Sequence, residues 1–123
     1  MKTKADILDS LDTFTTSYLE TALWSSTDDK DEPMDNRFSI DNFTRKALLG
    51  AIDDCNGFRE LAGELLQGID VSQAGHDFWL TRNRHGAGFW DRGLGEIGQK
   101  LTECAHSYGS CDLMNYKGNV SMG

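Results

Sequence analysis

The segment that most constrains the fold is His76–Gly93, where aromatic residues gather on both sides of a short polar turn. It holds two of the three Trp, two of the six Phe and two of the three His of the chain. Aromatic runs on either side of a glycine-containing turn are typical of a β-hairpin, in which alternate side chains point to opposite faces. The sequence therefore predicts a hairpin here, with Trp79 and Trp90 either on the open face of a sheet or beneath the N-terminal helices.

Three other segments carry apolar residues at helical spacing: 4–24, 39–67 and 94–107. Ser39 or Asp41 is expected to cap the second of these helices. The pair Asn56-Gly57 marks a break or kink within it, and Gly68 ends it. An acidic loop, residues 25–37, joins the first two helices and contains the only proline.

Residues 111–122 show a weaker pattern of a second hairpin, with its turn at Lys117-Gly118-Asn119. Helices and hairpins in this order predict an α+β fold in which a small antiparallel sheet of two hairpins packs against about three helices. A chain of 123 residues is expected to form a single domain, 1–123.

The charge of the chain is unevenly distributed. Residues 1–41 contain four Lys/Arg and ten Asp/Glu, residues 76–123 contain five of each, and the net charge is −8. Such a molecule is repelled by nucleic acid and anionic membranes and steered toward basic surfaces, although an acidic surface also serves solubility alone. The residues of the acidic loop expected to meet a basic partner are Asp28, Asp29, Asp31, Glu32 and Asp35.

Cysteine usage and hydropathy predict a cytoplasmic protein. The three cysteines form no C-x-x-C pair, which disfavours a disulfide framework and a zinc ribbon. No apolar run approaches the roughly 18 residues of a membrane span, and no signal peptide is expected.

Residues capable of catalysis or metal binding are present without a recognisable constellation. They are His76, Asp77, His85, Asp91, His106 and the three cysteines. No H-E-x-x-H or cysteine-pair spacing occurs, and Gly93–Gly98 resembles a nucleotide-binding loop only in its glycines, so a helix start is the better interpretation. We therefore expect a protein that is not an enzyme and has no metal and no cofactor.

The aromatic residues of His76–Gly93 allow three interpretations. Phe78, Trp79, Phe89 and Trp90 lie near three arginines in the sequence, a combination that suits stacking on single-stranded nucleic acid. The same residues suit a hydrophobic core or a protein-contact face. The negative net charge disfavours direct nucleic-acid binding.

Residues Ala74–Asp91 read AGHDFWLTRNRHGAGFWD. This segment resembles the signature A-G-H-D-F-W-L-T-R-N-x-H-G-x-G-F-W-D of a family of small, largely uncharacterised proteins from bacteriophages, prophages and plasmids. Asp54-Cys55 and Phe58 are also similar to the second helix of that family, so the resemblance covers roughly residues 40–108. The family usually has Gly where Arg84 stands, and a Tyr-rich final hairpin. The resemblance implies a mobile-element origin and supplies no activity.

An acidic protein of phage type without a catalytic constellation is most economically a binder. We expect a counter-defence inhibitor, anti-CRISPR or anti-nuclease, that occupies the basic nucleic-acid-binding surface of a host protein or nucleoprotein complex. Alternatively, the aromatic hairpin makes the chain an accessory phage or host-regulating protein that binds a protein or small ligand; an enzyme is the third alternative. Candidate anchors are Trp79, Arg82, His85 and Trp90. The oligomeric state stays open.

Overall fold

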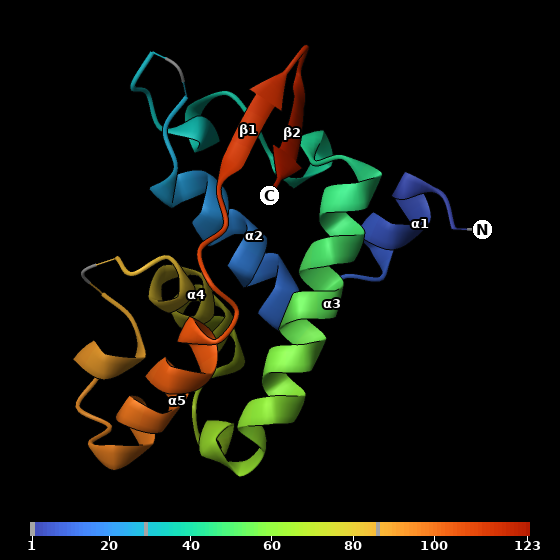
Figure 1. The fold of residues 1–123 in the computed structure, drawn as a ribbon. Coiled ribbons are helices and arrows are strands. Elements are labelled where there is room, and N and C mark those ends of the chain that lie inside the picture. Colours follow the sequence, from blue (N-terminus) through green and yellow to red (C-terminus); the bar gives the residue numbers. More distant parts are fainter. Residues whose placement is uncertain (1, 29, 86) are drawn as a thin grey trace.

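The computed structural model describes residues 2–28, 30–85 and 87–123 and is mostly helical (Figure 1). The helices are α1 (Lys4–Asp9), α2 (Thr13–Ser25), α3 (Arg45–Ala62), α4 (Val71–Arg82) and α5 (Glu96–His106). Short 3₁₀ turns are η1 (Met34–Asn36), η2 (Ile40–Asn42), η3 (Gly63–Leu66) and η4 (Phe89–Asp91). An antiparallel hairpin, β1 (Leu113–Tyr116) and β2 (Asn119–Met122), follows α5.

The prediction of an α+β fold with two hairpins is wrong, because residues 76–85 and 87–93, the described part of that segment, form no strands. Residues 76–82 are the second half of α4. The N-cap of this helix is Asp70, whose side chain accepts a hydrogen bond from the backbone N–H of Gln73. Phe89 and Trp90 belong to the 3₁₀ turn η4. A short run of aromatic residues is compatible with a buried helix and with a strand, so composition alone does not distinguish the two. Here the run is helical because it is buried against α2.

The close packing of α2 on α4 explains that outcome. A Cβ atom at Gly75 would collide with the backbone carbonyl of Phe14, so glycine lets the two helices approach closely. Phe78 then stacks on Phe58 of α3, with ring centroids 4.1 Å apart and an interplanar angle of 11°. Phe89 also stacks on Phe58, with ring centroids 5.7 Å apart. The aromatic residues thus form the centre of the core instead of a sheet face.

The N-terminal helical segment 4–24 is divided in two. Asp12 accepts a hydrogen bond from the backbone N–H of Thr15 and starts α2 as a separate helix. Likewise, α3 begins at Arg45 after the cap Thr44, whereas Ser39 precedes η2. The pair Asn56-Gly57 does not break α3; Gly57 leaves space for the hydroxyl group of Tyr108.

Two other sequence predictions are confirmed. The helix expected over 94–107 is α5, and the C-terminal hairpin forms with a two-residue turn at Lys117-Gly118, where both residues have positive φ. The hairpin covers the core through Val120, whose carbonyl accepts the backbone N–H of Thr44 at 2.9 Å.

Candidate functional site

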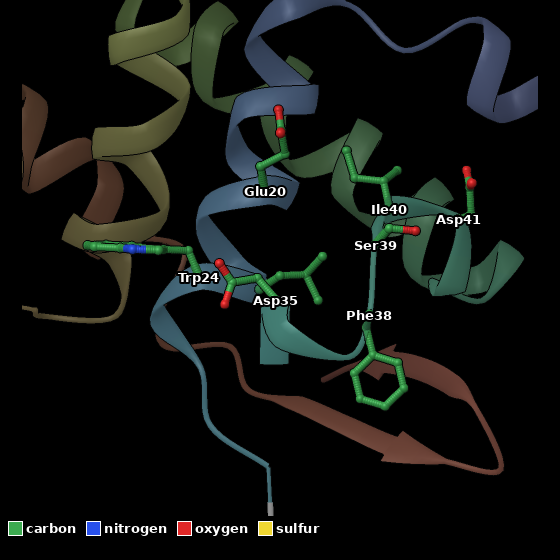
Figure 2. A pocket seen from close by; sticks show the side chains of 8 residues that line it. Glu20, Trp24, Asp35, Phe38, Ser39, Ile40 and Asp41 are labelled. Atoms are coloured by element: carbon green, nitrogen blue, oxygen red, sulfur yellow. The ribbon is translucent and has the colours of Figure 1, made fainter. Parts of the chain in front are cut away.

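A groove of about 480 Å³ lies between the second half of α2 and the segment from η1 to η2. We call it the acidic groove (Figure 2). Its lining residues are Glu20, Leu23, Trp24, Asp35, Phe38, Ser39, Ile40 and Asp41. Figure 2 shows Glu20 and Trp24 on successive turns of α2, with Asp35 and Asp41 on the facing segment.

The lining of the acidic groove combines an exposed indole with negative charge. Trp24 is 58% exposed, although large aromatic side chains are usually buried. Glu20, Asp35 and Asp41 are exposed, and the lining contains three carboxylates and no Lys or Arg. An exposed ring beside carboxylates is the environment that an arginine or lysine side chain prefers.

The nearest basic residue in the sequence, Arg37, is engaged elsewhere. Its Nη1 atom lies 3.2 Å from Oδ2 of Asp28, and its guanidinium carbon lies 5.0 Å from the centroid of the Phe38 ring. Arg37 therefore closes the base of the acidic loop instead of neutralising the groove.

The surface around Trp24 continues onto α4 through a shallower depression of about 340 Å³. The ring of His76 lies 5.9 Å from the Trp24 ring, and its Nδ1 atom lies 2.9 Å from Oγ1 of Thr21. Glu20 and Trp24 line both hollows, so they join the two into one surface.

The structure gives the predicted residues of the acidic loop different roles. Asp28 is buried and accepts hydrogen bonds from the backbone N–H groups of Lys30 (2.8 Å) and Glu32 (3.1 Å). These bonds, that from Glu32 first, and the pairing with Arg37 lower the pKa of Asp28. Asp31 and Glu32 are exposed, and Asp35 lines the acidic groove. Asp29 lies outside the described residues.

Two of the predicted anchors are core residues. Trp79 is 1% exposed, and its indole Nε1 donates to Oγ of Ser25 at 2.8 Å. Arg82 is 5% exposed. Its guanidinium donates to Tyr18 Oη, Asp54 Oδ2 and the carbonyls of Tyr108 and Gly109, all within 3.0 Å. The side chains of Trp79 and Arg82 therefore stabilise the packing of the helices.

Other polar residues of the Ala74–Asp91 motif are also bonded within the protein. Buried Asp77 accepts from Nε2 of Gln73 at 2.9 Å and from both Nε and Nη2 of Arg92. Thr81 Oγ1 accepts the backbone N–H of Phe89, and Asn83 Oδ1 accepts that of Cys111. The motif therefore encodes the way in which α4 is fixed to η4 and to the C-terminal segment.

The remaining two anchors, His85 and Trp90, are exposed in the segment between α4 and α5, and Trp90 is 56% exposed. The turn η4 that carries Trp90 packs beside α5, whereas the acidic groove is built from α2, η1 and η2 (Figure 1). The structure thus does not bring His85 and Trp90 into the groove with Asp35.

The described residues give two findings on metal binding and on the cysteines. Within 2–28, 30–85 and 87–123, no three His, Cys, Asp or Glu side chains are placed to hold a metal ion. Burial raises the pKa of the Cys55 thiol to about 12, and burial also raises the pKa of Cys111. Raised values of this kind keep thiols protonated and unreactive near neutral pH.

Sequence reasoning missed Glu20, Trp24 and Asp41. Glu20 and Trp24 stand four residues apart, so a helix places them on one face. A Trp on the same helical face as a Glu is the signal that could have identified them. Asp41 had been considered only as a helix cap.

The chain matches no protein-family model, and comparisons with curated proteins and with solved structures also give no match. The mobile-element family is therefore a prediction that rests on the motif alone. In the part of the chain that the structure describes, every helix is too short or too polar to cross a lipid bilayer.

Proposed function

We propose that this protein acts by binding, and that its acidic groove receives basic side chains from a nucleic-acid-binding surface of another protein. The observation that carries the proposal is a groove lined by the exposed Trp24 and by the carboxylates Glu20, Asp35 and Asp41, with no Lys or Arg among its lining residues. Surfaces that bind phosphate groups present Lys and Arg side chains, and carboxylates form ion pairs with the same side chains.

An arginine entering the groove gains two kinds of contact. Its guanidinium plane stacks on the indole of Trp24, and its N–H groups donate to a neighbouring carboxylate. Leu23, Phe38 and Ile40 give the groove an apolar lining that accepts the methylene stem. The ten acidic residues among 1–41 add long-range attraction, which speeds the encounter.

The resemblance to mobile-element proteins suggests the class of partner. A phage or plasmid protein that blocks a basic nucleic-acid groove would act as a counter-defence inhibitor of a host nuclease or of a CRISPR surveillance complex. In this proposal the protein itself contacts neither nucleic acid nor membrane.

The experiment is an affinity capture from host lysate with wild-type protein and with the variant Glu20→Gln/Asp35→Asn/Asp41→Asn. These changes keep side-chain shape and remove three charges from exposed positions, so the fold is expected to persist. The proposal requires a nucleic-acid-binding protein that the wild type retains, the variant loses and added DNA or RNA displaces. Equal capture by both proteins, or capture that nucleic acid does not displace, contradicts it.

A second candidate function rests on the exposure of Trp90 and His85. These residues are available to bind a protein or small ligand through the segment between α4 and α5. The matched test is Trp90→Ala in the same capture experiment. A partner lost with Trp90→Ala and kept with the charge-neutralised variant favours this alternative.

A further inference from the structure

A second groove, of about 620 Å³, separates the end of α2 and the start of the acidic loop from the hairpin. We call it the strand slot. Its lining residues are Ser25, Ser26, Thr27, Trp79, Asn83, His85, Ser110, Cys111, Asp112, Leu113, Met114 and Gly123. Extended backbone borders the slot on two sides, β1 on one and residues 26–28 on the other.

On the first side, the outer edge of β1 is unpaired. Asp112 and Gly123 exchange both backbone hydrogen bonds at 3.0 Å, and the ladder continues with Leu113 opposite Met122. Because hydrogen-bonded and non-bonded pairs alternate in an antiparallel ladder, the N–H and C=O groups of Leu113 and Asn115 point away from β2. In residues 2–28, 30–85 and 87–123 these groups have no hydrogen-bond partner.

One neighbouring backbone group that also points away from β2 has a hydrogen-bond partner. Cys111, two residues before Leu113, directs its N–H to Oδ1 of Asn83 at 2.8 Å. The Asn83 side chain thus binds the first outward backbone group at the base of the slot. The outward N–H and C=O groups of Leu113 and Asn115, further along β1, are the ones that a segment of another protein could bind.

On the second side, Thr27 presents a similar edge. It forms an isolated antiparallel bridge with Pro33, and the two flanking bonds join Asp28 N–H to Glu32 O and Met34 N–H to Ser26 O, each 2.9 Å. With this pattern the N–H and C=O of Thr27 itself point away from Pro33. Thr27 is exposed and lines the slot.

We propose that the strand slot accepts one extended, basic segment of a partner protein, which adds to β1 as a third strand and lies against Thr27. Main-chain hydrogen bonds to an unpaired edge are the basis of strand addition. The charge favours a basic segment, because Asp112 lines the slot, Asp31 and Glu32 stand exposed on the adjoining loop, and no Lys or Arg is among the lining residues. This inference does not depend on the acidic groove.

The test uses a defined probe, the capped peptide Ac-Arg-Val-Arg-Val-Arg-Val-NH₂, added to the full chain. The readout is backbone NMR with hydrogen exchange. We expect slowed exchange at the amides of Leu113, Asn115 and Thr27. The matched control is the same peptide with every internal backbone nitrogen methylated, which keeps its charge and removes the N–H donors of both edges. Methylation is expected to weaken binding by roughly tenfold or more, since each hydrogen bond contributes modestly.

Several results would overturn the inference. They are equal affinity for both peptides, unchanged exchange at those three amides, and an absence of binding at millimolar peptide. Protection of the same amides that rises with protein concentration alone would assign the slot to a second copy of this chain and would also overturn it. The variant Glu20→Gln/Asp35→Asn/Asp41→Asn should retain the methylation-sensitive binding, so failure here and failure of the acidic groove are separable.

Discussion

The aromatic segment, residues 74–92, and the acidic groove differ in how their side chains are used. In the aromatic segment, Trp79 and Arg82 are buried and bonded to α2, to α3 and to the backbone after α5, and Asp77 is paired with Arg92. In the acidic groove, Trp24 and the three carboxylates are exposed. The most patterned part of this sequence therefore maintains the fold, whereas the groove that we propose to bind a partner is assembled from residues with weak sequence signals.

The largest effect is expected from Arg82→Ala in the aromatic segment. It leaves Tyr18, Asp54 and two backbone carbonyls without their donor, so the free energy of unfolding should fall by about 3–5 kcal/mol. Urea denaturation followed by circular dichroism measures this loss. A loss below about 1 kcal/mol, the level of an exposed ion pair, would show that the network does not support the fold.

Arg84→Gly provides a contrasting change two residues away. Arg84 has φ of 57°, in the left-handed region that favours glycine. The substitution should raise the free energy of unfolding by up to about 1 kcal/mol, because the left-handed strain is relieved. The same denaturation experiment measures it, and a destabilised variant would contradict this reading of the turn.

Gly75→Ala should lower the free energy of unfolding by less than Arg82→Ala does. It places a methyl group against the Phe14 carbonyl and separates α2 from α4. Overpacking of this kind costs about 1–3 kcal/mol. The matched control is Gly50→Ala in α3, where a Cβ meets nothing within 4 Å. It should be neutral or stabilise the protein by up to about 1 kcal/mol. Thermal unfolding of both variants distinguishes helix contact from helix propensity.

These contacts show how far the sequence supports prediction. The helix over 94–107 and the hairpin at Lys117-Gly118 follow from local spacing and turn chemistry, and both are confirmed. The fate of Phe78 and Trp79 depends on α2, a partner far away in the sequence, so the aromatic run alone suggested a strand. Within the acidic loop, Asp28 accepts hydrogen bonds from the loop's own backbone, and only the folded chain brings Asp35 and Asp41 into one groove with Trp24.

Two exposed tryptophans, Trp24 in the acidic groove and Trp90 in the aromatic segment, allow the two regions to be tested against each other. Trp24→Ala should weaken binding of a nona-arginine peptide by roughly tenfold, because the ring stacks on the guanidinium. Trp90→Ala, which removes a ring of similar exposure outside the groove, should leave the affinity unchanged. Isothermal titration at low salt measures both. Equal losses would mean that the peptide makes no distinction between the two regions.

The smallest effect concerns pH. Hydrogen bonds from the backbone N–H groups of Glu32 and Lys30, with Arg37, lower the folded-state pKa of Asp28. Its contribution to stability is therefore present above the unfolded pKa of about 3.9 and is lost as the pH falls through the lower folded pKa. Asp28→Asn should flatten the acid side of the stability profile, as urea titrations between neutral and acidic pH would reveal. Asp31→Asn on the same loop is the control.

The most direct measurement follows the three tryptophan indole N–H signals by NMR while nona-arginine is added at low salt. Trp24 reports on the acidic groove, Trp79 on the buried core and Trp90 on the exposed part of the aromatic segment. We expect a saturable shift of the Trp24 signal, with the Trp90 signal nearly stationary; the Trp79 signal reports separately on the strand slot, which Trp79 also lines. A shift of Trp90 with Trp24 unchanged would contradict it and would place the binding surface in the aromatic segment.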